Sequence, residues 1–288
     1  MTHTLLTGRG LLESPRWHAA DARLYFSDWS AGEVVAVDPD GASEVVARVP
    51  SLPLCTAWHP DGSLLIVASH KGELLRLDPA TGALTTYADL GRPGWNDIVV
   101  DGRGTAYVNR AGFNPMSGEP FQPGFVARVT AAPQGSTTDA SVSEVADDIA
   151  FPNGMAVTDD DSTLIVADSY RHNLLAFDIA PDGALANRRV WVDLGDGTPD
   201  GICTDAHGAV WYADVPHQRC VRVAEGGHVS RTIDLDRGAF ACVLGGPDGR
   251  TLFITAATWR GMSATELVEP GSGRVLTVPV DVPGAGRP

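Results

Sequence analysis

Short apolar segments alternate with polar turns along the whole chain, and helical periodicity is almost absent. The apolar segments are rich in Val, Ile, Leu and Tyr, and Gly, Asp, Asn or Pro bounds most of them. Runs of about four to eight such residues between turn signals are typical of β-strands. The pattern therefore predicts an all-β protein built from hairpins.

One motif, an apolar strand followed by a polar turn and a second apolar strand, occurs six times. The copies begin at Glu13, Leu54, Asn96, Asn153, Asp200 and Phe240. Each hairpin is followed by a third apolar run and a short fourth one, so the repeat measures roughly 40 to 57 residues. Four-stranded repeats of this length are typical of propeller blades, because one blade cannot bury both faces without neighbours. We predict a six-bladed β-propeller that forms a single domain over residues 1–288, closed by pairing of residues 2–8 with residues 274–280.

Composition and charge narrow the functional class. With 288 residues, of which 43% are hydrophobic, the chain can bury a large core without disulfides. The four cysteines form no CxxC pair and are expected to be free thiols: Cys55, Cys203, Cys220 and Cys242. A net charge of −15 disfavours nucleic acid and anionic membranes, which require a basic surface. No apolar run approaches the roughly 18 residues of a membrane span, so we expect a cytoplasmic monomer that acts on a small molecule.

Four of the six equivalent hairpin starts carry a side-chain oxygen: Glu13, Asn96, Asn153 and Asp200. The first strand of a blade lies innermost, so these side chains are expected to converge at one end of the central channel. Two carboxylates and two carboxamides form a hard-oxygen set that suits one divalent ion, Ca²⁺ above all, then Mg²⁺ or Mn²⁺, and Zn²⁺ less well. The alternative is that they are turn residues whose side chains bond the local backbone.

The second strand of each hairpin runs back toward the same end of the channel. Its last residues and the loop that follows are therefore expected to surround a pocket and contact substrate, which gives the candidates Trp95, Asn96, Arg110, Asp168, Arg171 and Trp259. Because Asp28, Asp168 and Asp214 recur at the same place, a hydrogen bond that stitches each blade is the alternative for Asp168. The insertion from Arg110 to Gly124 follows such a strand and is expected to cover the pocket as a lid.

Four segments resemble the SMP-30/gluconolactonase family, also described as regucalcin-like: LLESPRW around Glu13, WNDIVVD around Asn96, FPNGMAVT around Asn153 and TPDGICTDAHGAVWYAD around Asp200. The resemblance extends over nearly the whole chain. It implies a six-bladed propeller in which Glu13, Asn153 and Asp200 bind the metal, Asn96 positions metal or substrate, and Asp200 transfers protons. Members of this family that act on sugar lactones often carry Arg two residues before the Asn of the Asn-Asp pair. Gly94 stands there in this chain, which favours a less polar lactone.

These residues favour metal-dependent hydrolysis of a lactone or similar small cyclic ester. A bound ion would polarise the carbonyl, and Asp200 would accept a proton from the attacking water and return it to the leaving alkoxide. One alternative is a non-hydrolytic biosynthetic enzyme, an isomerase, dehydratase or cyclase, that uses the same pocket. Another is a calcium-binding propeller without catalytic activity. Bulky Trp95, Phe240 and Trp259 near the ligand set favour a concave pocket over a flat interaction platform.

Overall fold

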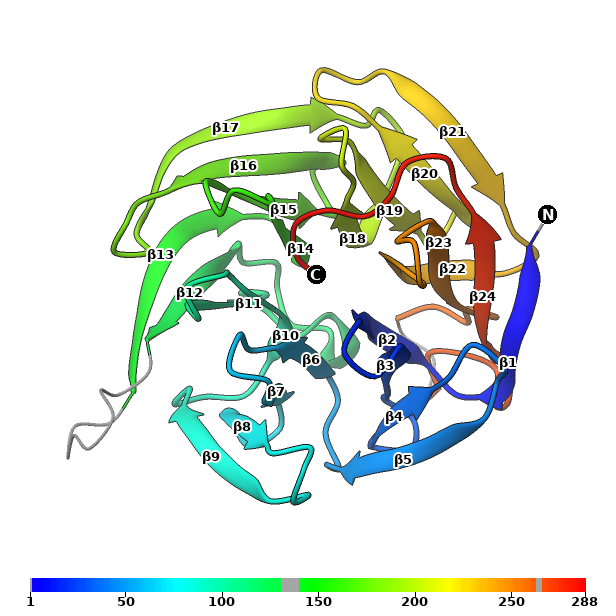
Figure 1. Cartoon of the computed structure of the whole chain (residues 1–288). Helices are drawn as coiled ribbons and strands as arrows, with labels where there is room; N and C mark the ends of the chain where they lie inside the picture. The colour runs from blue at the N-terminus through cyan, green and yellow to red at the C-terminus, as the bar shows by residue number, and fades with distance from the viewer. Residues whose placement is uncertain (1, 131–139, 263–265) are drawn as a thin grey trace.

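The computed structural model describes residues 2–130, 140–262 and 266–288, and the strands of these ranges form a ring of six four-stranded antiparallel sheets (Figure 1). This arrangement is a six-bladed β-propeller, as the sequence predicts. Among the described residues, no helix has the length and hydrophobicity required to cross a membrane. The cytoplasmic location and the monomeric state expected from the sequence stay predictions.

The blades are numbered here from the N-terminus. Blade 1 contains β2 (Leu12–His18), β3 (Arg23–Asp28), β4 (Glu33–Val37) and β5 (Ser43–Arg48). Blade 2 contains β6 (Leu54–Trp58), β7 (Leu64–Ala68), β8 (Glu73–Leu77) and β9 (Leu84–Asp89). Blade 3 contains β10 (Trp95–Val100), β11 (Ala106–Arg110), β12 (Gly124–Thr130) and β13 (Ser141–Ile149), with the 3₁₀ helix η1 (Pro115–Ser117) between β11 and β12.

The second half of the ring has the same construction. Blade 4 contains β14 (Pro152–Val157), β15 (Thr163–Asp168), β16 (Asn173–Ile179) and β17 (Leu185–Asp193). Blade 5 contains β18 (Pro199–Thr204), β19 (Val210–Asp214), β20 (Arg219–Val223) and β21 (Val229–Asp234). Blade 6 contains β22 (Gly238–Gly245), β23 (Thr251–Ala257), β24 (Gly273–Pro279) and β1 (His3–Arg9).

The ring closes where the two ends of the chain share blade 6. Strand β1 pairs antiparallel with β24, and His3 faces Thr277 in this pairing. The predicted pairing of the N-terminal and C-terminal segments is therefore confirmed. Because the last blade needs a strand from each end of the chain, neither end can leave without exposing the edge of a sheet.

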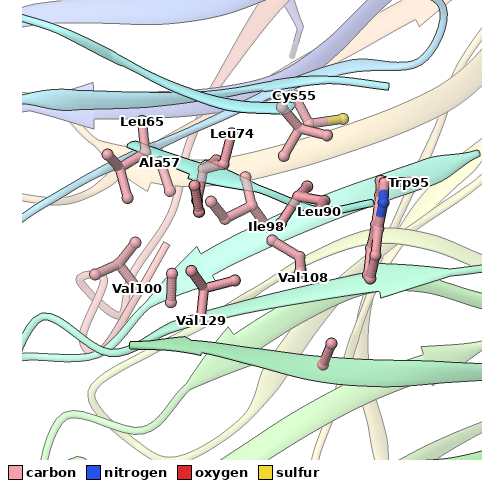
Figure 2. Close-up of a cluster of buried hydrophobic side chains, with 14 of the residues drawn as sticks. Cys55, Ala57, Leu65, Leu74, Leu90, Trp95, Ile98, Val100, Val108 and Val129 are labelled. Atoms are coloured by element: carbon pink, nitrogen blue, oxygen red, sulfur yellow. The ribbon is translucent and has the colours of Figure 1, made fainter. Parts of the chain in front are cut away.

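The hydrophobic core lies between neighbouring blades. The second strands are buried on both faces and are almost continuously apolar, as in β7, whereas outer strands such as β5 are partly exposed and carry polar residues. One cluster lies between blades 2 and 3 and includes Leu74, Ile98 and Val108 (Figure 2). The four cysteines are free thiols, as expected, and all four are buried.

The C-terminal tail crosses one end of the ring. At Val157, the last residue of β14, the amide donates to the Arg287 carbonyl at 2.6 Å and the carbonyl accepts the Arg287 amide at 2.8 Å. Beyond the end of β18, Ala206 donates its amide to the carbonyl of Pro283 at 2.9 Å. Figure 1 shows the C-terminus near the centre of the ring. The tail therefore occupies the end at which the inner strands finish, and the opposite end holds their beginnings.

Candidate functional site

The beginnings of the inner strands surround a cavity of about 510 Å³. Glu13, Asn96, Asn153 and Asp200 all line it, one from each of β2, β10, β14 and β18. Each of these side chains is partly exposed to the cavity, whereas most neighbouring positions in its strand are buried. The structure thus brings together the four residues that share one register in the sequence repeats.

A break in strand pairing occurs at each of these four positions. In β2 the regular pairing with β3 is interrupted between Glu13 and Arg16. The corresponding interruptions lie between Trp95 and Ile98, between Pro152 and Met155, and between Pro199 and Ile202. Such irregularities bend a strand and change the direction of a side chain. A further interruption lies in β22 between Ala239 and Ala241, at Phe240, so these irregularities occur where an inner strand turns a side chain toward the channel, whether that side chain is polar or apolar.

Two glycines explain why Asn153 and Asp200 occur in NG and DG pairs. A Cβ atom on Gly154 would collide with the Asp200 carbonyl oxygen of β18. A Cβ atom on Gly201 would collide with Ala241 of β22 in the same way. The inner strands approach each other so closely beside the cavity that only glycine fits after the polar residue.

Hydrogen bonds fix the orientation of the Asn153 amide. Its Nδ2 donates to Ser169 Oγ at 3.2 Å, and Ser169 Oγ donates to the Pro199 carbonyl at 2.6 Å. Because the Ser169 hydroxyl already donates its proton, it accepts from the amide nitrogen. The amide oxygen then faces Asn96, whose Nδ2 donates to it at 3.2 Å. Oδ1 of Asn153 is therefore directed toward the other site residues.

The two carboxylates of the set, Glu13 and Asp200, oppose each other electrostatically. Burial raises the pKa of Glu13 to about 8, and the neighbouring Asp97 carboxylate contributes. Burial, followed by the charge of Glu13, raises the pKa of Asp200 well above its usual range. Two acidic groups that destabilise each other's charged form are a suitable environment for a cation.

The donor chemistry fits a hard divalent ion. In the described residues no group of three or more His, Cys, Asp and Glu side chains is placed to hold a metal. Two of the four converging side chains are carboxamides, so amide oxygens would complete the ligand set. Oxygen ligands of mixed charge are those that Ca²⁺ and Mg²⁺ prefer.

A second polar group, which the sequence interpretation missed, lies beside the four residues. Arg16 Nη2 approaches Asp97 Oδ1 at 3.3 Å, and the Met155 amide donates to Asp97 Oδ2 at 3.1 Å. The Asp97 amide in turn donates to Asn109 Oδ1 at 3.2 Å, and Asn109 Nδ2 donates to the Asn153 carbonyl at 2.6 Å. Arg16 and Asp97 lie within the segments LLESPRW and WNDIVVD, so the family motifs contained the signal.

Two of the predicted substrate contacts line the cavity in addition to Asn96. Trp259 does so with 39% of its surface exposed. Arg110 donates from Nε to the Pro93 carbonyl at 2.8 Å, and its guanidinium lies against Gly94. A Cβ atom at position 94 would be 3.2 Å from Arg110 Nε. Arg110 therefore occupies the space that a side chain at position 94 would enter.

Trp95 does not line the cavity, which corrects the expectation from the sequence. Only 2% of its surface is exposed, and its ring packs edge-on against Phe125 at 5.5 Å between centroids. Figure 2 shows Trp95 within the cluster of blades 2 and 3, together with Leu90 and Val108. The residue lies next to Asn96, but successive side chains of a strand point to opposite faces.

Asp168 and Arg171 also lie outside the cavity lining. The buried Asp168 carboxylate accepts the backbone amides of Ala150 and Phe151 at 2.8 and 2.9 Å, just before β14 begins. The blade-stitching alternative therefore describes its contacts. Arg171 is exposed and pairs with Asp148 at 2.8 Å, so its guanidinium is engaged outside the pocket.

The insertion of residues 110–124 contributes several residues to the cavity lining: Arg110, Ala111, Phe113, Asn114, Pro115, Met116 and Glu119. Phe113 is its buried anchor, with ring centroids 6.1 Å from Phe151 and 6.0 Å from Tyr170. The segment predicted to be a lid thus lies at the mouth that contains the four converging side chains.

Comparisons with known proteins agree with this architecture. The profile of the SMP-30/gluconolactonase/LRE-like region matches residues 11–258. The chain is 28% identical to 6-deoxy-6-sulfogluconolactonase of Pseudomonas putida over 96% of its own length and 93% of that protein. It is 28% identical to regucalcin of Xenopus laevis over 85% and 82% of the two chains. The crystal structure of a calcium-binding protein, regucalcin, from Agrobacterium tumefaciens has the same fold, with a TM-score of 0.81 at 21% identity over 100% and 96% of the chains.

Proposed function

Because the chain belongs to the SMP-30/gluconolactonase/LRE-like family, we propose that it is a lactone hydrolase that works with one divalent metal ion. The observation that carries the proposal is the convergence of Glu13, Asn96, Asn153 and Asp200 in one cavity. The relative from Pseudomonas putida is named as a lactonase, which supports the same reaction class.

Glu13, Asn153 and Asp200 are the proposed metal ligands, and Asn96 is the proposed contact to metal or substrate. We assign Ca²⁺ as the ion, because the set contains only oxygen donors and a relative of the same fold is described as calcium-binding. When bound, such an ion supplies Lewis acidity that polarises an ester carbonyl and lowers the pKa of water. Ser169 orients the Asn153 amide, because turning the amide over would lose both its donation to Ser169 and its acceptance from Asn96; its oxygen would be the donor to a bound ion.

Asp200 is the proposed proton-transfer residue. Water adds to the lactone carbonyl carbon while the Asp200 carboxylate accepts the proton that water loses. The ring C–O bond then breaks, the leaving alkoxide takes the proton from Asp200, and the product is a hydroxy acid. Burial and the charge of Glu13 raise the pKa of Asp200 in the metal-free protein. A bound cation would lower it, which would keep Asp200 in the carboxylate form that a base requires.

Turnover of lactones in oxygen-18 water, before and after removal of divalent ions, tests the proposal. We expect metal-dependent ring opening with one labelled oxygen in the product carboxylate. A converted product without label would establish a non-hydrolytic enzyme instead. Tight Ca²⁺ binding without turnover of any lactone would establish the non-catalytic calcium-binding alternative.

A further inference from the structure

The cavity has a polar floor and an apolar wall. The floor is formed by the four converging side chains. The wall consists of apolar side chains from loops and strands around the ring, among them Trp29, Leu52, Phe151, Val215, Phe240 and Trp259. These residues come from blades 1, 5 and 6, from the connection between blades 1 and 2, and from the connection between blades 3 and 4. A ligand that fills the cavity therefore meets hydrocarbon on several sides once it extends beyond the floor.

One part of the wall is an aromatic corner formed by Phe113, Phe151 and Tyr170. Phe151 and Tyr170 stack with 4.8 Å between ring centroids and an interplanar angle of 17°. Phe113 reaches them from the insertion of blade 3, and all three residues line the cavity. Tyr170 nevertheless keeps 46% of its surface exposed. An aromatic surface that the protein positions but leaves exposed inside a pocket is suited to cover an apolar ligand.

The wall offers few hydrogen-bond partners for hydroxyl groups of a ligand. Each hydroxyl of a polyhydroxylated ring loses its hydrogen bonds to water on binding and must regain them from the protein. The polar side chains of the wall are few, and several have partners within the protein. Arg110 Nε and Nη1 donate to the carbonyls of Pro93 and Ala111, and Asn114 Oδ1 and Glu119 Oε2 accept backbone amides of their own loop. His70 and Thr198 also line the cavity. The cavity volume of about 510 Å³ also lies within the range of roughly 300 to 1,000 Å³ typical of sites for larger organic ligands.

Building on the proposed function, we infer that the substrate is a lactone with an apolar substituent, an alkyl chain or an aryl group. The ester group lies over the floor, and the substituent lies against the aromatic corner of Phe113, Phe151 and Tyr170. Specificity then comes mainly from burial of hydrocarbon, which is proportional to the apolar area removed from water.

A series of γ-lactones whose alkyl substituent grows from methyl to octyl tests the inference, with an aldonolactone as the polar comparison. We expect kcat/KM to rise about threefold to fourfold with each methylene group until the corner is filled. We also expect the aldonolactone to be the poorest substrate. A kcat/KM that stays constant or falls with chain length would overturn the inference.

Variants at Tyr170 connect the chain-length dependence to the aromatic corner. In Tyr170→Ala, kcat/KM should rise less with alkyl chain length. Tyr170→Phe should retain the full rise, because the face of the aromatic ring remains. The matched control is Val190→Ala, since Val190 lies in the same blade and is 59% exposed but does not line the cavity. Ca²⁺ affinity should be unchanged in all three. If kcat/KM of Tyr170→Ala still rises fully with alkyl chain length, the substituent does not bind at the aromatic corner.

The outcomes separate this inference from the proposed function. If the protein hydrolyses aldonolactones and rejects alkyl lactones, the hydrolase proposal stands and the apolar substituent is wrong. If no lactone is hydrolysed, γ-lactams with the same alkyl chains report on the corner by calorimetry. Binding that strengthens with chain length would support an apolar ligand even though the hydrolase proposal has failed. Binding independent of chain length would reject the apolar substituent as well as the hydrolase proposal.

Discussion

The side-chain amide of Asn153 donates to the hydroxyl of Ser169 at 3.2 Å. The same hydroxyl donates to the carbonyl of Pro199, the residue before Asp200, at 2.6 Å. Ser169 follows the second strand of blade 4, whereas Pro199 begins blade 5. One buried hydroxyl therefore orients one proposed ligand and holds the strand that carries another.

Replacement of this hydroxyl should weaken both the metal site and the fold. In Ser169→Ala the Asn153 amide loses its orienting partner, so we expect Ca²⁺ affinity to fall about 10-fold to 100-fold, as for other residues that orient metal ligands. The lost hydrogen bonds should also lower the free energy of unfolding by about 1–3 kcal/mol. Calorimetry and urea denaturation measure the two effects. Ser162→Ala, at an exposed position of the same blade, is the control. Unchanged affinity would show that the amide needs no support from Ser169.

Asp200 and Glu13 should respond differently to removal of charge. Asp200→Asn keeps an oxygen of similar position but removes the base, so turnover at saturating metal should fall about 10²-fold to 10⁴-fold. Glu13→Gln should lose metal affinity first and regain much of its activity in excess metal. Occupancy must be measured in the same samples by elemental analysis. Near-normal turnover of metal-loaded Asp200→Asn would leave Asp200 as a ligand without a role in proton transfer.

Metal binding should depend on pH because both carboxyl groups have raised pKa values. With the pKa of Glu13 at about 8, the metal-free protein holds a proton there at neutral pH, and binding must release it. Ca²⁺ affinity should therefore rise with pH up to about pH 8. Calorimetry in buffers of different ionisation enthalpy measures the released protons, and binding without proton release would contradict the expected protonation.

The raised pKa of Glu13 also makes the stability of the metal-free protein depend on pH. The pKa of Glu13 is 4.5 in the reference state and about 8 when folded, so the folded state binds the proton more tightly. This contribution to stability is fully present below pH 4.5 and is lost as the pH rises through 8. We expect the gap in Tm between Ca²⁺-loaded and metal-free protein to widen from pH 5 to pH 8.5. A constant gap in thermal unfolding scans would argue against the raised pKa.

Gly94 should resist substitution for two reasons. Its φ of +96° is unfavourable for residues with a Cβ atom, and that atom would lie 3.2 Å from Arg110 Nε. We expect Gly94→Ala to lower the free energy of unfolding by about 1–3 kcal/mol and to change kcat/KM by displacing Arg110. Gly62→Ala is the matched control, because Gly62 has a φ of +86° and no atom within 4 Å of its added Cβ. Equal kinetics of the two variants would exclude a role of Arg110 in the cavity.

The contacts around the cavity depend on tertiary structure that the strand pattern does not contain. The sequence places Trp95 beside Asn96, but only the packing of blades 2 and 3 decides that the indole enters the core. The exposed Arg171 lies near the predicted rim, yet Asp148 engages it outside the pocket. The pairing of Arg16 with Asp97 likewise joins blades 1 and 3 across more than eighty residues of sequence.

The sequence by itself determined the number of blades and the register of the polar residues. Each blade repeats one hydrophobic pattern. Glu13, Asn153 and Asp200 occupy equivalent positions in their blades, so they must lie at the same end of the ring when similar units are arranged around an axis. Only the tertiary structure decided the shape and polarity of the wall above them. That wall is built from loops such as residues 110–124, whose positions depend on contacts with neighbouring blades, because loops lack the repeated backbone pairing that fixes a strand.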